Sequence, residues 1–278
     1  MTPRSWISSM SASSLVLRLA HSRPLALGLL AFAAGAFAAD DPIRLPPGTL
    51  AQVGVIDALL AGNYDGTAPL AGLTRYGDFG LGTFDRIDGE MVVLDGVIYQ
   101  VRGTGTVARA DLAGSTPFAA VCHFQGKALP GELRAIDFAA LKRTIDAAYP
   151  AENVPLALRV DGRFALVRTR SVPAQQRPYR PLAEVTRTQV EFEAKDVTGT
   201  LLGFRLPAFV KGLNAPGYHL HFLSADRSFG GHVLDFEVAA GAAQVQELRN
   251  LFVALPVDQP GSAGARPGEL QQAASSHH

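Results

Sequence analysis

The sequence has 278 residues, of which 47% are hydrophobic and 18% are charged. This composition is typical of a globular protein and is too apolar for intrinsic disorder. Lys+Arg and Asp+Glu number 25 each, so the formal net charge is zero, which disfavours nucleic acid and anionic membranes as partners because both attract a positive surface. Cys122 is the single cysteine of the sequence. It excludes an internal disulfide and a site built from several thiolates, so a bound metal would need histidine and carboxylate ligands.

Residues 1–38 have the pattern of a secretory signal peptide. Three arginines and no acidic residue precede Asp40, an apolar run covers residues 25–34, and the small-residue pattern Ala-Phe-Ala ends at residue 38. The apolar run is shorter than the roughly 20 residues that span a bilayer. We therefore expect export to the periplasm or the medium, with cleavage after residue 38.

After a Pro-rich lead-in over residues 39–48, we expect a mixed α/β domain over residues 49–180. We expect a short helix over residues 55–60. A longer amphipathic helix is expected over residues 137–149, where apolar residues recur at helical spacing before a proline. Strands are expected at the runs 90–94, 97–101, 118–124, 156–160 and 164–172. The dipeptides Asp95-Gly96 and Asp161-Gly162 separate two pairs of these strands and predict two hairpins.

A linker with three prolines is expected over residues 173–185. Beyond it we expect a mainly β, barrel-like domain over residues 181–258, with alternating strands, a turn at Thr198-Gly199 and a short helix over residues 245–251. Residues 259–278 are expected to form a flexible tail. The predicted fold class is therefore α+β with two domains, the second of which carries the chain's candidate metal site.

That candidate site consists of three histidines within 14 residues, His219, His221 and His232. The first two are spaced i, i+2, which places both imidazoles on one face of a strand. A turn composition follows, and an antiparallel pairing centred on it sets His232 opposite His221 and diagonal to His219. Cβ atoms of such residues are about 4.5–5.5 Å and about 7–8 Å apart, so the three imidazoles can converge on one ion. Three protein ligands and an open position are typical of catalytic zinc.

Two other interpretations use the same residues. The histidines could be buried structural side chains that are satisfied by hydrogen bonds. They could also belong to a cupin-like iron oxygenase, in which Asp226 would supply the carboxylate ligand. Against the cupin interpretation, His232 is too near in sequence to be the distant third histidine of that fold.

With these residues in view, the sequence resembles the alpha-acetolactate decarboxylase family. The resemblance covers residues 50–255 and rests on three blocks, which are residues 82–96 (GTFD followed by DGE and LDG), residues 199–205 (GTLLGFR) and residues 217–236 (GYHLHFLSADRSFGGHVLDF). The family implies a two-domain, homodimeric zinc enzyme that removes carbon dioxide from 2-acetolactate to give (R)-acetoin.

The resemblance also implies roles for individual residues. His219, His221 and His232 correspond to the zinc ligands. Glu90 corresponds to a glutamate at the metal, and we expect it to act as the general acid. Arg170 corresponds to the arginine of the substrate pocket, where it would hold the substrate carboxylate, and Thr83 lines the same pocket.

The family has a further glutamate near its C-terminus that approaches the metal. Glu269 is the only candidate for it after Asp258, because no other acidic residue occurs in this tail. If that glutamate is absent, the sequence leaves open an exported metal- or ligand-binding protein without turnover.

Overall fold

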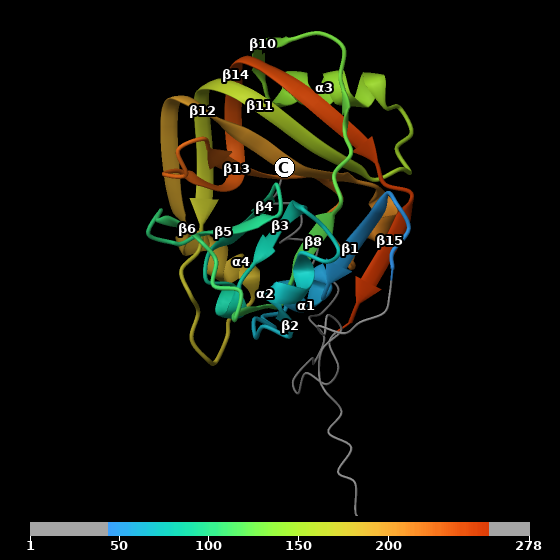
Figure 1. Ribbon diagram of the computed structural model, residues 1–278. Helices are drawn as coiled ribbons and strands as arrows, with labels where there is room; N and C mark the ends of the chain where they lie inside the picture. The colour runs from blue at the N-terminus through green and yellow to red at the C-terminus, as the bar shows by residue number, and fades with distance from the viewer. Residues whose placement is uncertain (1–43, 256–278) are drawn as a thin grey trace, which may run out of the picture. The chain divides into compact units, whose positions relative to one another are not determined.

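Two β-sheets that share a core make up most of the computed structural model, which describes residues 44–255 (Figure 1). The seven-stranded sheet has the order β15-β1-β8-β3-β4-β5-β6. Its strands are β1 Thr49–Val53, β3 Phe79–Thr83, β4 Glu90–Leu94, β5 Val97–Val101, β6 Val107–Arg109, β8 Ala119–Cys122 and β15 Asn250–Ala254.

The second sheet has the order β10-β14-β11-β12-β13, and β9 pairs with β14. Its strands are β9 Lys127–Ala128, β10 Leu133–Asp137, β11 Leu156–Ser171, β12 Val190–Leu206, β13 Gly217–Ser224 and β14 Gly230–Glu247. Because β13 also pairs with β14, the strands β14, β11, β12 and β13 form a closed hydrogen-bonded circuit. A small separate pair is formed by β2 Ala68–Pro69 and β7 Ser115–Thr116.

The helices are few and short. They are α1 Ile56–Leu60, α2 Leu70–Leu73, α3 Phe138–Ala148 and α4 Leu182–Val185, with 3-10 turns at Asp85–Ile87, Thr186–Thr188 and Ala208–Val210. The helices predicted over residues 55–60 and 137–149 are confirmed as α1 and α3. Asp137 caps α3 by accepting a hydrogen bond from the backbone N–H of Ala140, and Leu141 and Ile145 pack into the core of the six-stranded sheet. Among the described residues, no helix is long and apolar enough to cross a membrane.

The hairpin at Asp95-Gly96 is confirmed, with Leu94 paired to Val97 and both turn residues at positive φ. The hairpin predicted at Asp161-Gly162 is wrong, because β11 runs through this dipeptide as one strand of 16 residues. A Cβ on Gly162 would lie 2.4 Å from the Ala240 carbonyl oxygen of β14. The glycine therefore permits close approach of two strands and does not make a turn.

Two further predictions are wrong for related reasons. Strand β12 continues through Thr198-Gly199, where a Cβ on Gly199 would meet the Phe222 ring at 2.5 Å. The helix predicted over residues 245–251 is the end of β14 followed by β15. Val245 lies on β14 and pairs with Leu158 of β11. The apolar residues of a buried strand were therefore mistaken for those of a helix.

The two-domain division near residue 180 is not confirmed. Strands β11 and β12 lie on either side of the predicted linker and pair along their whole length, from Leu156–Arg205 to Ser171–Val190. The seven-stranded sheet likewise takes β15 from the far end of the chain. One buried cluster contains side chains from both sheets, Leu81 and Phe79 together with Leu202 and others. The predicted signal peptide lies outside the described residues, and so does the predicted tail.

Candidate metal centre and adjoining pocket

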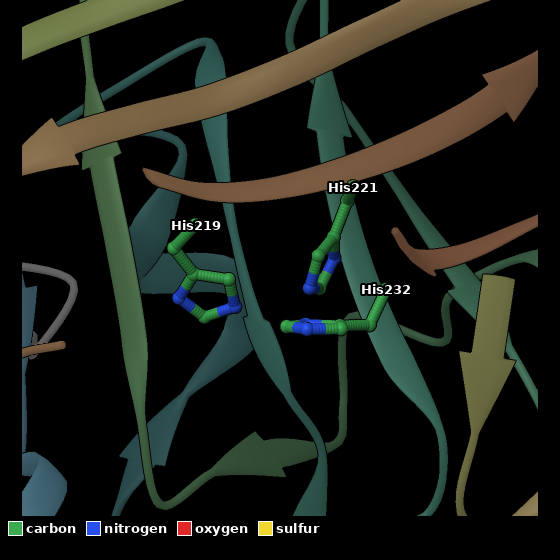
Figure 2. A group of neighbouring side chains, drawn as sticks. All are labelled: His219, His221 and His232. Carbon is green, nitrogen blue, oxygen red and sulfur yellow. The ribbon is translucent and has the colours of Figure 1, made fainter. Parts of the chain in front are cut away.

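The three histidines of the sequence prediction meet in the structure. His219 and His221 lie on β13 and His232 lies near the start of β14, where it pairs directly with His221. One nitrogen from each ring lies within 4.8 Å of the others. Figure 2 shows the three rings directed toward a common point. The register predicted from the spacing and the turn is therefore confirmed.

The turn between these strands explains why they align. Asp226 accepts hydrogen bonds from the Ser224 hydroxyl and from the backbone and side chain of Ser228. These bonds lower the pKa of Asp226 to about 2, with the Ser224 hydroxyl the largest cause. The Asp226 carboxylate is thus engaged in the turn and is not part of the histidine group. The cupin-like assignment of Asp226 as a metal ligand is wrong.

His221 is fully buried, and its two ring nitrogens differ. Nδ1 lies 2.8 Å from the backbone carbonyl oxygen of Met91 and can donate to it, which leaves the lone pair on Nε2. Within residues 44–255 Nε2 has no hydrogen-bond partner, and it lies 3.5 Å from Oε2 of Glu90. Burial lowers the pKa of His221 to about 4, so the ring is neutral near pH 7. A buried, neutral imidazole with an unused lone pair fits a metal ligand.

Strand register brings three more of the predicted residues to this point. Glu90 opens β4 and pairs with Thr83 of β3, whose hydroxyl donates to the Gly89 carbonyl oxygen at 2.8 Å. Arg170 of β11 pairs with His232. Burial raises the pKa of Glu90 to about 7, and the positive charge of Arg170 acts in the opposite direction. Burial also lowers the pKa of Arg170, against the effect of the Glu90 and Glu191 carboxylates.

A small pocket of about 70 Å³ lies beside the histidines. Its polar lining comes from the predicted residues Thr83, Glu90, Arg170, His219 and His232, and from Thr186, which was not predicted. Its apolar lining was not predicted and comes from Ile56, Leu59, Ile87, Phe118, Val172 and Leu182. The signal was weak, because in the sequence these residues look like ordinary core positions on separate elements. A wider groove of about 880 Å³ reaches His219 and His232 from the side of α3.

Comparison with known proteins agrees with this arrangement. A sequence model described as alpha-acetolactate decarboxylase matches residues 50–261. The chain belongs to the alpha-acetolactate decarboxylase family. The enzymes of this family are carboxy-lyases, and so is this protein.

Relatives within the family cover most of the chain. An alpha-acetolactate decarboxylase of Methanosarcina mazei is 43% identical over 80% of this chain and 76% of its own length. That of Klebsiella aerogenes is 37% identical over 82% of this chain and 88% of its own. The crystal structure of the acetolactate decarboxylase from Bacillus subtilis subspecies spizizenii superposes with a TM-score of 0.79 at 31% identity, covering 83% of this chain and 100% of that one.

The structure thus brings together every predicted site residue that it describes. Glu269, the candidate for the C-terminal glutamate of the acetolactate decarboxylase family, lies outside the described residues. One contact at the site was not anticipated: the Gln189 amide oxygen accepts a hydrogen bond from Nη1 of Arg170 at 2.7 Å. No sequence motif marks Gln189, which lies between the predicted linker over residues 173–185 and the strand that begins at Val190.

Proposed function

We propose that the protein catalyses the zinc-dependent decarboxylation of 2-acetolactate to (R)-acetoin and carbon dioxide. The observation that carries this proposal is the meeting of three imidazoles, within 4.8 Å of one another, beside a pocket that also holds Glu90 and Arg170. Membership of the alpha-acetolactate decarboxylase family supports the same reaction.

The residues present fit a zinc ion. His219, His221 and His232 would hold it, and Nε2 of His221 is a buried nitrogen that has no hydrogen-bond partner among the described residues. Three nitrogen ligands leave a coordination position for a substrate, as in catalytic zinc sites. When bound, zinc supplies Lewis acidity that stabilises negative charge developing on neighbouring oxygen atoms.

Arg170 is the group that would bind the substrate carboxylate. Its planar guanidinium can meet two carboxylate oxygens at once. The negative charge leaves this carboxylate as the bond to carbon dioxide breaks, and the electron pair moves into the neighbouring ketone. Arg170 therefore serves the reaction best by orienting the carboxylate, since only interactions that favour the transition state accelerate it.

Glu90 is placed to deliver the proton that replaces the departing carboxylate. Its pKa of about 7, raised by burial, allows it to carry a proton near neutral pH. It reaches the pocket from β4, whereas Arg170 reaches it from β11. Delivery from one fixed wall would give a single handedness of product.

The remaining lining would exclude water and hold the alkyl groups. Six apolar side chains, among them Phe118 and Leu182, also line the pocket. A dry surrounding strengthens the electrostatic contacts of Arg170 and Glu90. The Thr83 hydroxyl is directed to the Gly89 carbonyl oxygen and stabilises the start of β4, where Glu90 lies.

We also propose that the mature protein is exported and works as a homodimer. Export rests on the signal-peptide pattern of residues 1–38, and the dimer rests on the family resemblance. Size-exclusion chromatography with light scattering of protein secreted from its host would test both.

The reaction is tested with purified protein and racemic acetolactate. We expect acetoin formation that stops after treatment with a chelator and returns with zinc, and chiral chromatography should show the R form. A folded, zinc-loaded protein that produces no acetoin would contradict the proposal and favour a binding protein without turnover.

A further inference from the structure

Arg170 donates a hydrogen bond to Gln189, a residue that does not line the pocket. Arg170 is 8% exposed, and Nη1 of its guanidinium donates to Oε1 of Gln189 at 2.7 Å. Arg170 lines the pocket, whereas Gln189 does not. Any effect of Gln189 on a bound substrate must therefore pass through Arg170.

The backbone places Gln189 at this point. Arg170 of β11 pairs with Glu191 of β12, and Gln189 lies two residues before Glu191, on the same side of the strand pair. The backbone N–H of Gln189 bonds to the Thr186 carbonyl oxygen at the end of a 3-10 turn. The residue is thus fixed where the connecting segment enters β12.

The amide of Gln189 is also fixed in its orientation. Its Nε2 donates to Oε1 of Glu191 at 3.4 Å, and Oε2 of Glu191 accepts from Arg168 at 3.2 Å. A carboxylate can only accept here and a guanidinium can only donate, so the amide must direct its oxygen to Arg170 and its nitrogen to Glu191. A row of four side chains therefore connects the protein surface with the buried guanidinium.

We infer that Gln189 is a positioning residue that aims Arg170 at the substrate carboxylate, an inference that rests on the role proposed for Arg170. A neutral amide suits this task better than an acid. A carboxylate at residue 189 would form a two-point ion pair with the guanidinium and compete with the substrate. The amide occupies one N–H group and leaves the positive charge available.

The experiment compares Gln189→Leu and Gln189→Glu with the control Gln175→Leu. Gln175 lies on the same connecting segment, is half-buried, and its side chain donates to the nearby Pro173 carbonyl oxygen. For each protein we would measure kcat and KM for acetolactate, zinc content and thermal stability. We would also measure the inhibition constant of 3-hydroxy-3-methylbutan-2-one, in which a methyl group replaces the substrate carboxylate.

We expect Gln189→Leu to lower kcat/KM by roughly 10- to 100-fold, the equivalent of one lost hydrogen bond to a charged group. Gln189→Glu should raise KM for acetolactate by at least the same factor. Both variants should keep their zinc and bind the neutral ketone as the wild type does, because only the carboxylate meets Arg170. Gln175→Leu should behave as the wild type.

If the wild-type protein converts acetolactate to acetoin, two results would overturn the inference about Gln189 and leave the proposed function intact. One is a Gln189→Leu variant with the kinetics of Gln175→Leu. The other is an equal loss of affinity for acetolactate and for the neutral ketone, which would assign Gln189 a purely structural role. Absence of acetoin from the wild type would instead overturn the proposed function, and the inference with it.

Discussion

The Nδ1 atom of His221 lies 2.8 Å from the backbone carbonyl oxygen of Met91, an atom of the other sheet. His221 is on β13 of the six-stranded sheet, and Met91 follows Glu90 on β4 of the seven-stranded sheet. One short stretch of β4 therefore sets both the hydrogen bond that orients the imidazole and the carboxylate that faces its Nε2. The metal centre depends on the packing of the two sheets against each other.

Replacement of His221 should remove the metal and destabilise the fold. In His221→Ala one of three ligands is lost, and the Met91 carbonyl oxygen loses its partner in a buried position. Leaving such a group unsatisfied costs about 1–3 kcal/mol, before the loss of packing is added. We expect less than one equivalent of bound zinc by elemental analysis and a lower urea midpoint in the presence of chelator.

His123→Ala is the matched control, because His123 is exposed and lies outside the histidine group. It should keep both its metal and its stability. Full zinc occupancy in purified His221→Ala would contradict the assignment of His221 as a ligand.

Replacement of Glu90 should separate metal binding from turnover. Glu90→Gln keeps the shape of the side chain but cannot supply the proton, and general acids typically contribute 10²–10⁴-fold to a rate. We expect zinc content to be retained and kcat to fall by about that factor. Glu132→Gln, which changes an exposed partner of Arg134, should leave kcat unchanged. Turnover of Glu90→Gln at the wild-type rate would show that another group delivers the proton.

Gly203 of β12 allows close approach of β13, the strand that carries His219 and His221. It has a φ of +152°, and a Cβ there would lie 2.1 Å from the backbone carbonyl oxygen of His219. In Gly203→Ala the strands β12 and β13 must move apart, and we expect a loss of about 1–3 kcal/mol, as for other overpacked sites, together with weaker zinc binding. Gly131→Ala is the control, because Gly131 also has positive φ but a Cβ there would meet no atom of the described residues within 4 Å. If both variants bind zinc equally well, close approach at Gly203 does not matter for the site.

The histidine site could be predicted because the three residues lie close together in the sequence, on one hairpin. An i, i+2 spacing and a turn of known length determine which side chains of a hairpin face each other, and His221 does pair with His232. The Asp95-Gly96 hairpin was predicted for the same reason. Glu90, Arg170 and Thr83 come from distant strands, and only the family resemblance selected them.

The errors arose where tertiary contacts gave a residue another use. Gly162 and Gly199 read as turn residues, yet each lies inside a long strand against the backbone or ring of a neighbour. Their lack of a side chain serves strand packing, which no local pattern reveals. Gln189 escaped notice in the same way, because its importance comes from one contact with a residue of the adjacent strand.

The thiol of Cys122 should be unreactive in the folded protein. Cys122 is fully buried on β8, and burial raises the pKa of its thiol above the ordinary value, so almost no thiolate is present. We expect an aromatic disulfide reagent at pH 8 to label it only in denaturant, at a rate that follows unfolding. Because the sequence has no other cysteine, labelling can be read without ambiguity. Rapid labelling of the native protein would place Cys122 at the surface, contrary to the structure.

Asp226 should make the folded state sensitive to acid. Its folded-state pKa of about 2 is lower than the value of about 3.9 that is usual for an unfolded chain. A lowered pKa stabilises the fold above the unfolded value, so this contribution is lost as the pH falls from about 4 to about 2. In chelator, the urea midpoint of the wild type should drop across this window more than that of Asp226→Asn. The chelator is needed because protonation of the histidines would otherwise release metal and obscure the comparison. Parallel curves for the two proteins would mean that the turn hydrogen bonds of Asp226 do not depend on its charge.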